Sequence, residues 1–74
     1  RARLGGVADQ PELLELLRIY LSEAGAVQRI AERLGVHRNS VPARLARLRR
    51  ALGVDIEDAE QRANLWFALH FWAE

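Results

Sequence analysis

The feature that most constrains the fold is a three-to-four-residue spacing of apolar side chains, interrupted at intervals by glycine. Stretches with this spacing end before Gly25, Gly35 and Gly53. Such spacing places apolar side chains on one face of an α-helix, and glycine readily takes the left-handed conformation that ends a helix. No stretch alternates apolar and polar residues convincingly, as a half-buried strand does. The sequence therefore predicts an all-α fold, a small bundle of four main helices over residues about 10–24, 27–34, 38–52 and 59–73.

Local signals mark where two of these helices begin. Asp9-Gln10-Pro11-Glu12 and Asp58-Ala59-Glu60-Gln61 both resemble capping boxes, in which a side chain at the helix start accepts a backbone hydrogen bond. Proline also suits a first helical turn. Val54 and Ile56 lie between the third and fourth helices, and we expect them to anchor that link.

The length and the missing residue types exclude several classes of protein. The 74 residues suffice for a single small domain covering residues 1–74, and no cysteine is available for a disulfide or a thiolate metal site. No apolar run is long enough to span a membrane, and no signal peptide is evident. The acids lie at helix starts, where capping explains them. We therefore predict no enzyme activity, no cofactor and no metal site, His37 and His70 included, and a cytoplasmic location.

A net charge of +1 conceals a strong asymmetry along the chain. Residues 29–50 contain seven arginines and one glutamate, a net of +6, whereas residues 1–28 carry −1 and residues 51–74 carry −4. A concentrated basic segment in a nearly neutral protein is the charge distribution expected of an anion-binding face.

The basic segment also has the pattern of a helix-turn-helix DNA-binding unit. A short helix over 27–34 is followed by the turn Gly35-Val36-His37 and a longer arginine-rich helix. Ala31 is small where the two helices must cross, and Val36 can insert into the core. An ordinary helical hairpin also uses small residues and glycine, but the seven arginines favour nucleic-acid binding. RNA binding is less favoured because the basic region has no aromatic platform.

The string from Gly35 to Val41, Gly-Val-His-Arg-Asn-Ser-Val, is followed by Arg44-Leu45. It resembles the C-terminal helix-turn-helix of PucR/CdaR-type bacterial transcription regulators, with a looser similarity to Fis-type domains. The resemblance covers roughly residues 13–70 and implies sequence-specific binding of double-stranded DNA, with a recognition helix in the major groove. It also implies a homodimer in the full-length protein and an upstream sensory domain. The absence of methionine agrees with a C-terminal fragment of a longer regulator, because an initiator methionine is not normally removed before Arg1.

Pro42 departs from the family pattern, which usually has a basic residue and an aromatic where this chain has Pro42 and Ala43. If His37 caps the recognition helix, Pro42 falls at the fifth helical position and removes a backbone hydrogen bond. If Asn39 is the cap, Pro42 sits in the first turn, where proline is tolerated. We expect either the later start or an irregular first turn.

A helical wheel separates the apolar stripe of the third helix from its outer face, and this assigns candidate DNA contacts. Base contacts are assigned to Arg38, Asn39, Ala43 and Arg47, because arginine commonly reads guanine, asparagine reads adenine, and a methyl group can meet thymine. Phosphate contacts are assigned to Gln28, Arg33, His37, Ser40, Arg44 and Arg50. Arg49 and Arg62 are expected to be structural and to pair with acids such as Glu57 or Glu60.

The last helix has more apolar side chains than a surface helix of a small domain should show. Leu65, Leu69 and Trp72 share one face, whereas Phe67 and Phe71 lie on another. The core could use both faces. Alternatively, Trp66, Phe67, His70 and Phe71 form an interface with a second copy or with an upstream domain. A helical protein–protein interaction or dimerisation module is therefore the alternative to DNA binding.

Overall fold

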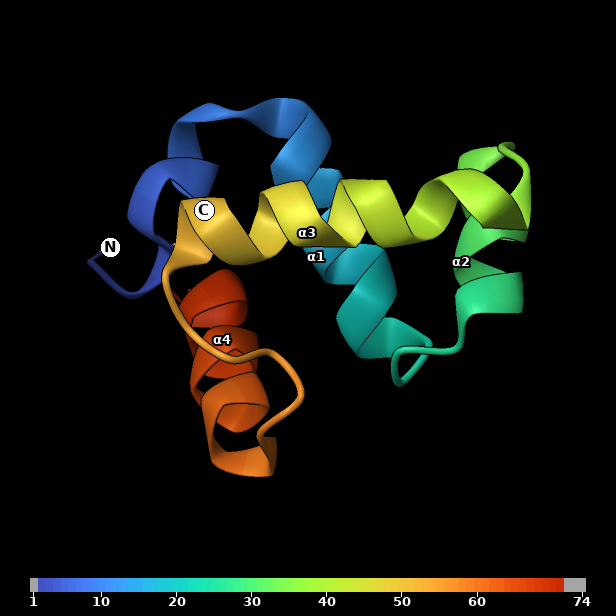
Figure 1. Ribbon diagram of the computed structural model, residues 1–74. Helices are drawn as coiled ribbons and strands as arrows, with labels where there is room; N and C mark the ends of the chain where they lie inside the picture. The colour runs from blue at the N-terminus through green and yellow to red at the C-terminus, as the bar shows by residue number, and fades with distance from the viewer. Residues whose placement is uncertain (1, 72–74) are drawn as a thin grey trace.

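The apolar stripe of the arginine-rich helix faces the hydrophobic core. The computed structural model describes residues 2–71, and its α-helices are α1 (Pro11–Ser22), α2 (Val27–Leu34), α3 (Val41–Leu52) and α4 (Ala59–Phe71). Helix α3 buries four aliphatic side chains at the predicted spacing: Val41, Leu45, Leu48 and Leu52. Helix α1 lies behind α3, α2 lies at one end of it, and α4 runs below it (Figure 1). The all-α prediction is confirmed, since residues 2–71 contain no strand.

A 3-10 helix at the start of the chain, η1 (Ala2–Asp9), was not predicted. It packs against α1, α3 and α4. Its side chains Leu4 and Val7 are almost completely buried. A 3-10 helix has three residues per turn, so these two positions lie on the same side of it. Two apolar residues three apart are too short a pattern to identify such a helix from sequence, although they contribute to the core.

The helix boundaries agree with the predicted ranges to within a few residues, with one capping error. The N-cap of α1 is Gln10 and makes no side-chain capping bond, so the predicted capping box at Asp9 is wrong. Pro11 instead occupies the first helical position, where its missing N–H costs nothing. At α4 the prediction holds, because the Asp58 carboxylate accepts a hydrogen bond of 3.0 Å from the backbone N–H of Gln61. Residues 72 and 73 of the predicted last helix lie outside the described residues.

The three glycines predicted to end helices all have positive φ. Gly35 and Gly53 are the C-caps of α2 and α3, as predicted. Gly25 does not cap α1 directly, because the helix ends at Ser22 and Glu23 is its C-cap. Ala24 and Gly25 then both take positive φ, and the Gly25 N–H donates to the carbonyl of Tyr20 at 3.0 Å.

The link between α3 and α4 is held to the core at Ile56, which is completely buried. The hydroxyl of buried Tyr20 donates a hydrogen bond of 3.1 Å to the Ile56 carbonyl. Arg62 donates to the next carbonyl, that of Glu57, at 2.7 Å. Val54 is half-buried against the same cluster. The link therefore has the anchoring role predicted for it, and it fixes α4 relative to α1.

Candidate nucleic-acid interface

Helices α2 and α3 form a helix-turn-helix pair around a short turn. Gly35 adopts φ +72°, and the Val36 N–H donates to the Ala31 carbonyl at 3.0 Å. Ala31 is 3% exposed, so it fills the contact between the helices. Val36 packs against the core from the turn. Each of the three residues has the role that the sequence predicted for it.

The recognition helix begins with an irregular turn rather than a regular α-helix. Residues Arg38–Ser40 form a 3-10 turn, η2, and the regular helix α3 starts only at Val41. His37 caps η2, since its Nδ1 accepts the backbone N–H of Asn39 at 3.0 Å. The Ser40 hydroxyl donates to the His37 carbonyl at 2.9 Å. The predicted helix over 38–52 is therefore a 3-10 turn followed by an α-helix.

This start explains how Pro42 is accommodated. Pro42 is the second residue of α3, within the first turn, where a backbone N–H has no partner inside the helix. Ser40, rather than Asn39, is the residue before the helix. The structure thus combines the two expected solutions, a later helix start and an irregular first turn. Arg38 and Asn39 belong to η2 and are oriented by its geometry rather than by that of α3.

Four predicted contact residues gather around an open hollow between α2 and η2. Gln28, His37, Arg38 and Asn39 line it, together with Ala31, Glu32 and Val36. All four predicted side chains are exposed. We call these four residues the N-terminal cluster. Sequence reasoning did not place Glu32 here, although it is the one acid in the basic segment and lies four positions after Gln28.

Two other predicted residues meet at the opposite end of the recognition helix. Arg47 and Arg50 line a second open hollow with Gln10, Leu13 and Ala51, where α3 passes the start of α1. We call Arg47 and Arg50 the C-terminal cluster. Gln10 was missed as a neighbour of this cluster, because only the tertiary fold brings the start of α1 to α3. Ala43 and Arg44 are exposed on α3 between the two clusters.

Three of the seven arginines of the basic segment form ion pairs with acidic side chains. Arg33 lies 3.2 Å from Glu23, and Arg29 lies 3.8 Å from the same carboxylate. Arg33 also donates to the Ser22 hydroxyl at 2.8 Å. Arg49 pairs with Glu57 at 3.3 Å, as predicted. Arg62, outside this segment, is also structural but bonds to backbone carbonyls rather than to an acid. A phosphate contact by Arg33 stays a prediction and would compete with its bonds to α1.

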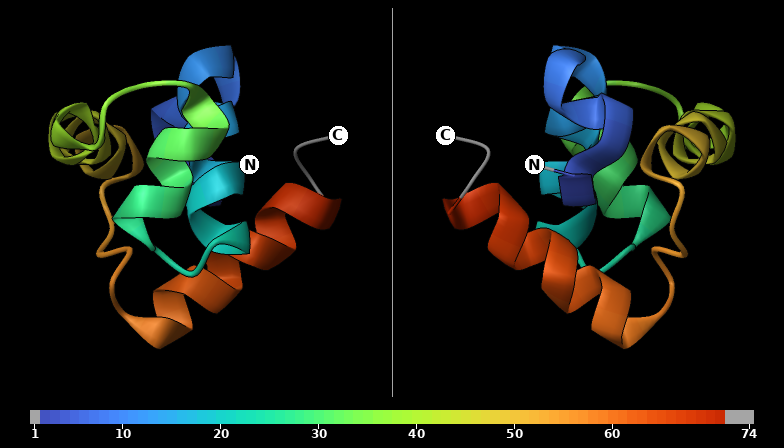
Figure 2. Two further views of the ribbon diagram at one scale, coloured as in Figure 1. Left: turned by 90° about the vertical axis from the view of Figure 1, so that its right-hand side faces the viewer. Right: turned by 90° about the vertical axis from the view of Figure 1, so that its left-hand side faces the viewer.

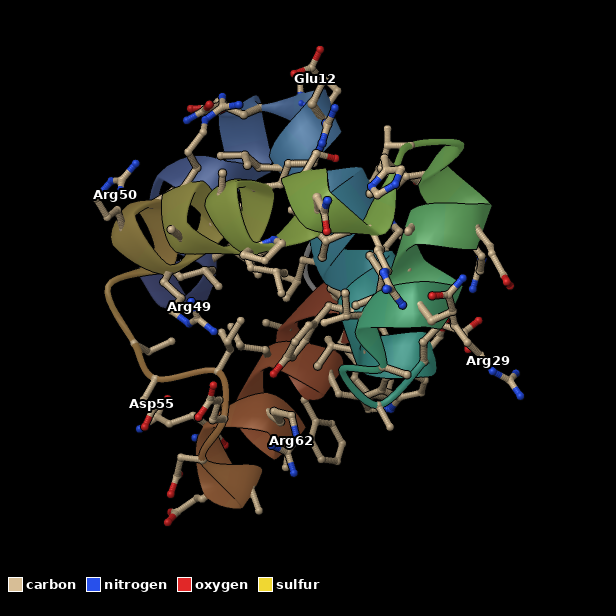
Figure 3. The ribbon with its side chains drawn as sticks, turned by 45° about the vertical axis from the view of Figure 1, so that its right-hand side comes forward. Glu12, Arg29, Arg49, Arg50, Asp55 and Arg62 are labelled. Carbon is tan, nitrogen blue, oxygen red and sulfur yellow. The ribbon has the colours of Figure 1, made fainter. Side chains whose placement is uncertain are left out.

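The other four arginines of the segment remain available to an external anion. Within residues 2–71, no hydrogen bond or ion pair is found for Arg38, Arg44, Arg47 or Arg50. Arg49 and Arg50 illustrate the division, since they are adjacent in sequence but diverge in space (Figure 3). Arg49 points toward the link that contains Asp55, and Arg50 projects away from the domain.

The two clusters are well separated along the recognition segment. From Asn39 to Arg50 the chain rises roughly 17 Å along the helix axis at about 1.5 Å per residue. Exposed Ala43 and Arg44 lie between the two clusters. The exposed side of the segment therefore carries arginines at both ends and along its length.

Two other kinds of feature are absent from the described part of the chain. Residues 2–71 contain no group of three or more His, Asp or Glu side chains that could hold a metal ion. None of the helices in this range is long and apolar enough to cross a membrane. The two hollows described above are open, and their lining residues include no pair of a nucleophile and a base.

The exposed aromatic side chains of α4 lie apart from the α2–α3 unit. Trp66 is 46% exposed, Phe67 60% and Phe71 69%, and His70 is exposed beside them. Leu65, Ala68 and Leu69 form the buried face. The core therefore does not use both faces of α4. Trp72, predicted to share the Leu65 face, lies outside the described residues.

Comparison with known proteins matches most of the described chain, from α1 to α4, and includes the α2–α3 pair. The family model described as the PucR C-terminal helix-turn-helix domain matches residues 13–71. The chain is also 51% identical over 65 residues to an uncharacterised protein in the pkwA 5′ region of Thermomonospora curvata. That match covers 88% of this chain but only 36% of the relative. No solved structure matches the chain significantly.

Proposed function

Because the chain belongs to the PucR C-terminal helix-turn-helix family, whose members bind DNA in transcription regulators, we propose that it binds double-stranded DNA sequence-specifically. In this proposal η2 and α3 enter the major groove. The observation that carries it is the set of four arginines along the recognition segment that no acid within residues 2–71 neutralises. An arginine without an intramolecular partner can contact a DNA phosphate, and so release its counterion, without first breaking an ion pair within the protein.

Base contacts are proposed for Arg38, Asn39, Ala43 and Arg47. Arg38 and Asn39 are exposed on the 3-10 turn, at the end of the recognition segment that helix-turn-helix proteins direct toward base edges. Arginine can pair with two acceptors of guanine, and asparagine can pair with adenine through one donor and one acceptor. Exposed Ala43 lets the helix backbone approach the groove floor, where its methyl group can contact that of thymine.

Phosphate contacts are proposed for Gln28, Arg33, His37, Ser40, Arg44 and Arg50. The hydrogen bond at His37 supports its part in this set. Because Nδ1 accepts the Asn39 N–H, the neutral ring carries its proton on Nε2. That N–H is then free to donate to a phosphate oxygen. Ser40 is the most constrained member, since its hydroxyl already donates to the His37 carbonyl and retains only its acceptor capacity.

The full-length protein is proposed to act as a cytoplasmic homodimer that reads two half-sites. Two recognition helices would then be about 34 Å apart, or a multiple of this distance, along one face of the duplex. An upstream sensory domain and the absence of enzyme activity in this domain belong to the same proposal. The relative from Thermomonospora curvata agrees with a longer parent protein, since the match spans only 36% of it.

Selection of bound duplexes from a random pool at two salt concentrations tests this function. We expect enrichment of a defined motif whose affinity falls with rising salt, because phosphate contacts dominate affinity and base contacts specify. The spacing of any repeated half-site also tests the dimer. Failure to bind any duplex, or binding without salt dependence, would refute the proposal.

The second candidate function is a helical protein–protein module that uses α4. The exposed Trp66, Phe67 and Phe71 favour it, because large aromatic side chains are enriched in protein interfaces. It becomes the primary function if the selection yields no duplex. Both functions can coexist, since α3 and α4 lie along different edges of the domain in both side views (Figure 2).

A further inference from the structure

The solvent-facing side of α4 is graded from small to large side chains along the helix. Ala59 and Ala63 are exposed in its first half. Trp66, Phe67, His70 and Phe71 are exposed in its second half. Their spacing of three and four residues places all six on one side of the helix. We call this set the graded face.

The rings on the graded face are packed against one another before any partner arrives. The centroids of Trp66 and His70 are 3.9 Å apart, and those of Phe67 and Phe71 are 5.7 Å apart. The His70 Nδ1 lies 2.9 Å from the Trp66 carbonyl oxygen, which orients the imidazole. Side chains that are already ordered lose less conformational entropy on binding. The face is therefore a pre-organised apolar surface.

The charge of this side of α4 argues against two classes of partner. On the helical wheel Glu60 lies within the face, between Phe67 and Phe71, and Arg62 lies beside the face, next to Trp66. The Arg62 guanidinium already donates to the carbonyls of Ile56 and Glu57. Nucleic acids and anionic membranes both require basic residues for attraction, and the graded face itself contains no arginine or lysine. An apolar protein surface fits it better.

We propose that the graded face binds the graded face of a second copy, with the two α4 helices antiparallel. In that orientation the alanine half of one helix lies against the aromatic half of the other, so that bulky rings meet small side chains on both sides. A parallel pair would instead place rings against rings and leave a gap between the alanines. Self-complementarity under a two-fold axis is the requirement for a symmetric dimer.

The exposed area predicts a weak dimer. Applying the exposed fractions of 46%, 60% and 69% to side chains of about 150–250 Å² each gives roughly 350 Å² per copy. Two copies would bury roughly 700 Å² from these rings, below the about 1,200 Å² at which stable specific interfaces begin. We therefore expect dissociation in the high micromolar range, and closer association where a common DNA or a longer chain raises the local concentration.

Sedimentation velocity of the chain without DNA, over about 10 µM to 1 mM, tests association separately from DNA binding. Phe67→Glu should raise the dimer dissociation constant at least about tenfold, because it places a charge at the centre of an apolar contact. The matched control is Val27→Glu, which changes another exposed apolar residue on α2. A wild-type chain that stays monomeric throughout, or an equal effect of both substitutions, would overturn the proposal.

Cysteine cross-linking tests the antiparallel orientation directly, because the chain contains no cysteine. Ala59→Cys and His70→Cys chains are mixed and oxidised, with circular dichroism confirming that each variant is folded. The two-fold axis lies near the middle of the graded face, so the antiparallel pair places position 59 close to position 70 of the other copy and predicts that mixed 59–70 disulfides exceed 59–59 disulfides. An excess of 59–59 disulfides would refute it in favour of a parallel pair. The result does not depend on whether the domain binds DNA.

Discussion

Replacement of Arg44 by alanine tests whether the arginines without an intramolecular partner carry the DNA affinity. Four such arginines lie along the recognition segment. At about 0.9 per neutralised phosphate, the three arginines proposed as phosphate contacts, Arg33, Arg44 and Arg50, give a slope of log K against log salt of about −2.7 per domain. Arg44→Ala should make that slope shallower by about 0.9. When the salt concentration rises fourfold, the wild-type affinity should therefore fall about 3.5 times further than the affinity of the variant.

The assay is fluorescence anisotropy with a labelled duplex, titrated at several sodium chloride concentrations. The matched control is Arg49→Ala, which removes the same charge from α3 at a position where Glu57 already pairs with it at 3.3 Å. That variant should leave the slope nearly unchanged and lose only about 0–1 kcal/mol of folding stability with its exposed ion pair. Equal changes of slope for the two variants would refute the division of the arginines into paired and unpaired sets. So would an unchanged slope for Arg44→Ala.

Three further predictions concern base reading, a buried hydrogen bond and the turn. Arg38→Ala and Asn39→Ala should each cost about 1–3 kcal/mol on the preferred duplex and less on altered ones, measured by competition between duplexes; uniform losses would indicate phosphate contact instead. Tyr20→Phe should lower the free energy of unfolding by about 1 kcal/mol in urea, because the Ile56 carbonyl loses its 3.1 Å bond. Gly35→Ala should lower it by about 1–2 kcal/mol through its φ of +72° alone, since a Cβ there would meet no atom within 4 Å. A neutral effect would show that the turn relaxes.

The local pattern of the chain was sufficient to predict the helices and the turn between α2 and α3. Apolar spacing and a left-handed glycine act within a few residues, so they can be recognised without knowledge of the rest of the fold. The irregular start of the recognition helix was also predictable, because Pro42 forbids a regular helix that begins at His37. The capping error at Asp9 shows the limit of such signals. Helix α1 starts at Pro11, and its N-cap residue Gln10 makes no capping hydrogen bond through its side chain.

The sequence by itself determined that a basic segment of seven arginines forms a helix-turn-helix unit. The pairing of Arg49 with Glu57 was also expected from the sequence. Only the tertiary structure decided that Arg33 is paired as well, because Glu23 lies 10 positions before it and no helical periodicity predicts that contact. The tertiary structure also decided the role of η1, because its side chains Leu4 and Val7 become buried only when η1 packs against the other helices. Ion pairing and burial depend on distances between elements, whereas helix formation depends on neighbours along the chain.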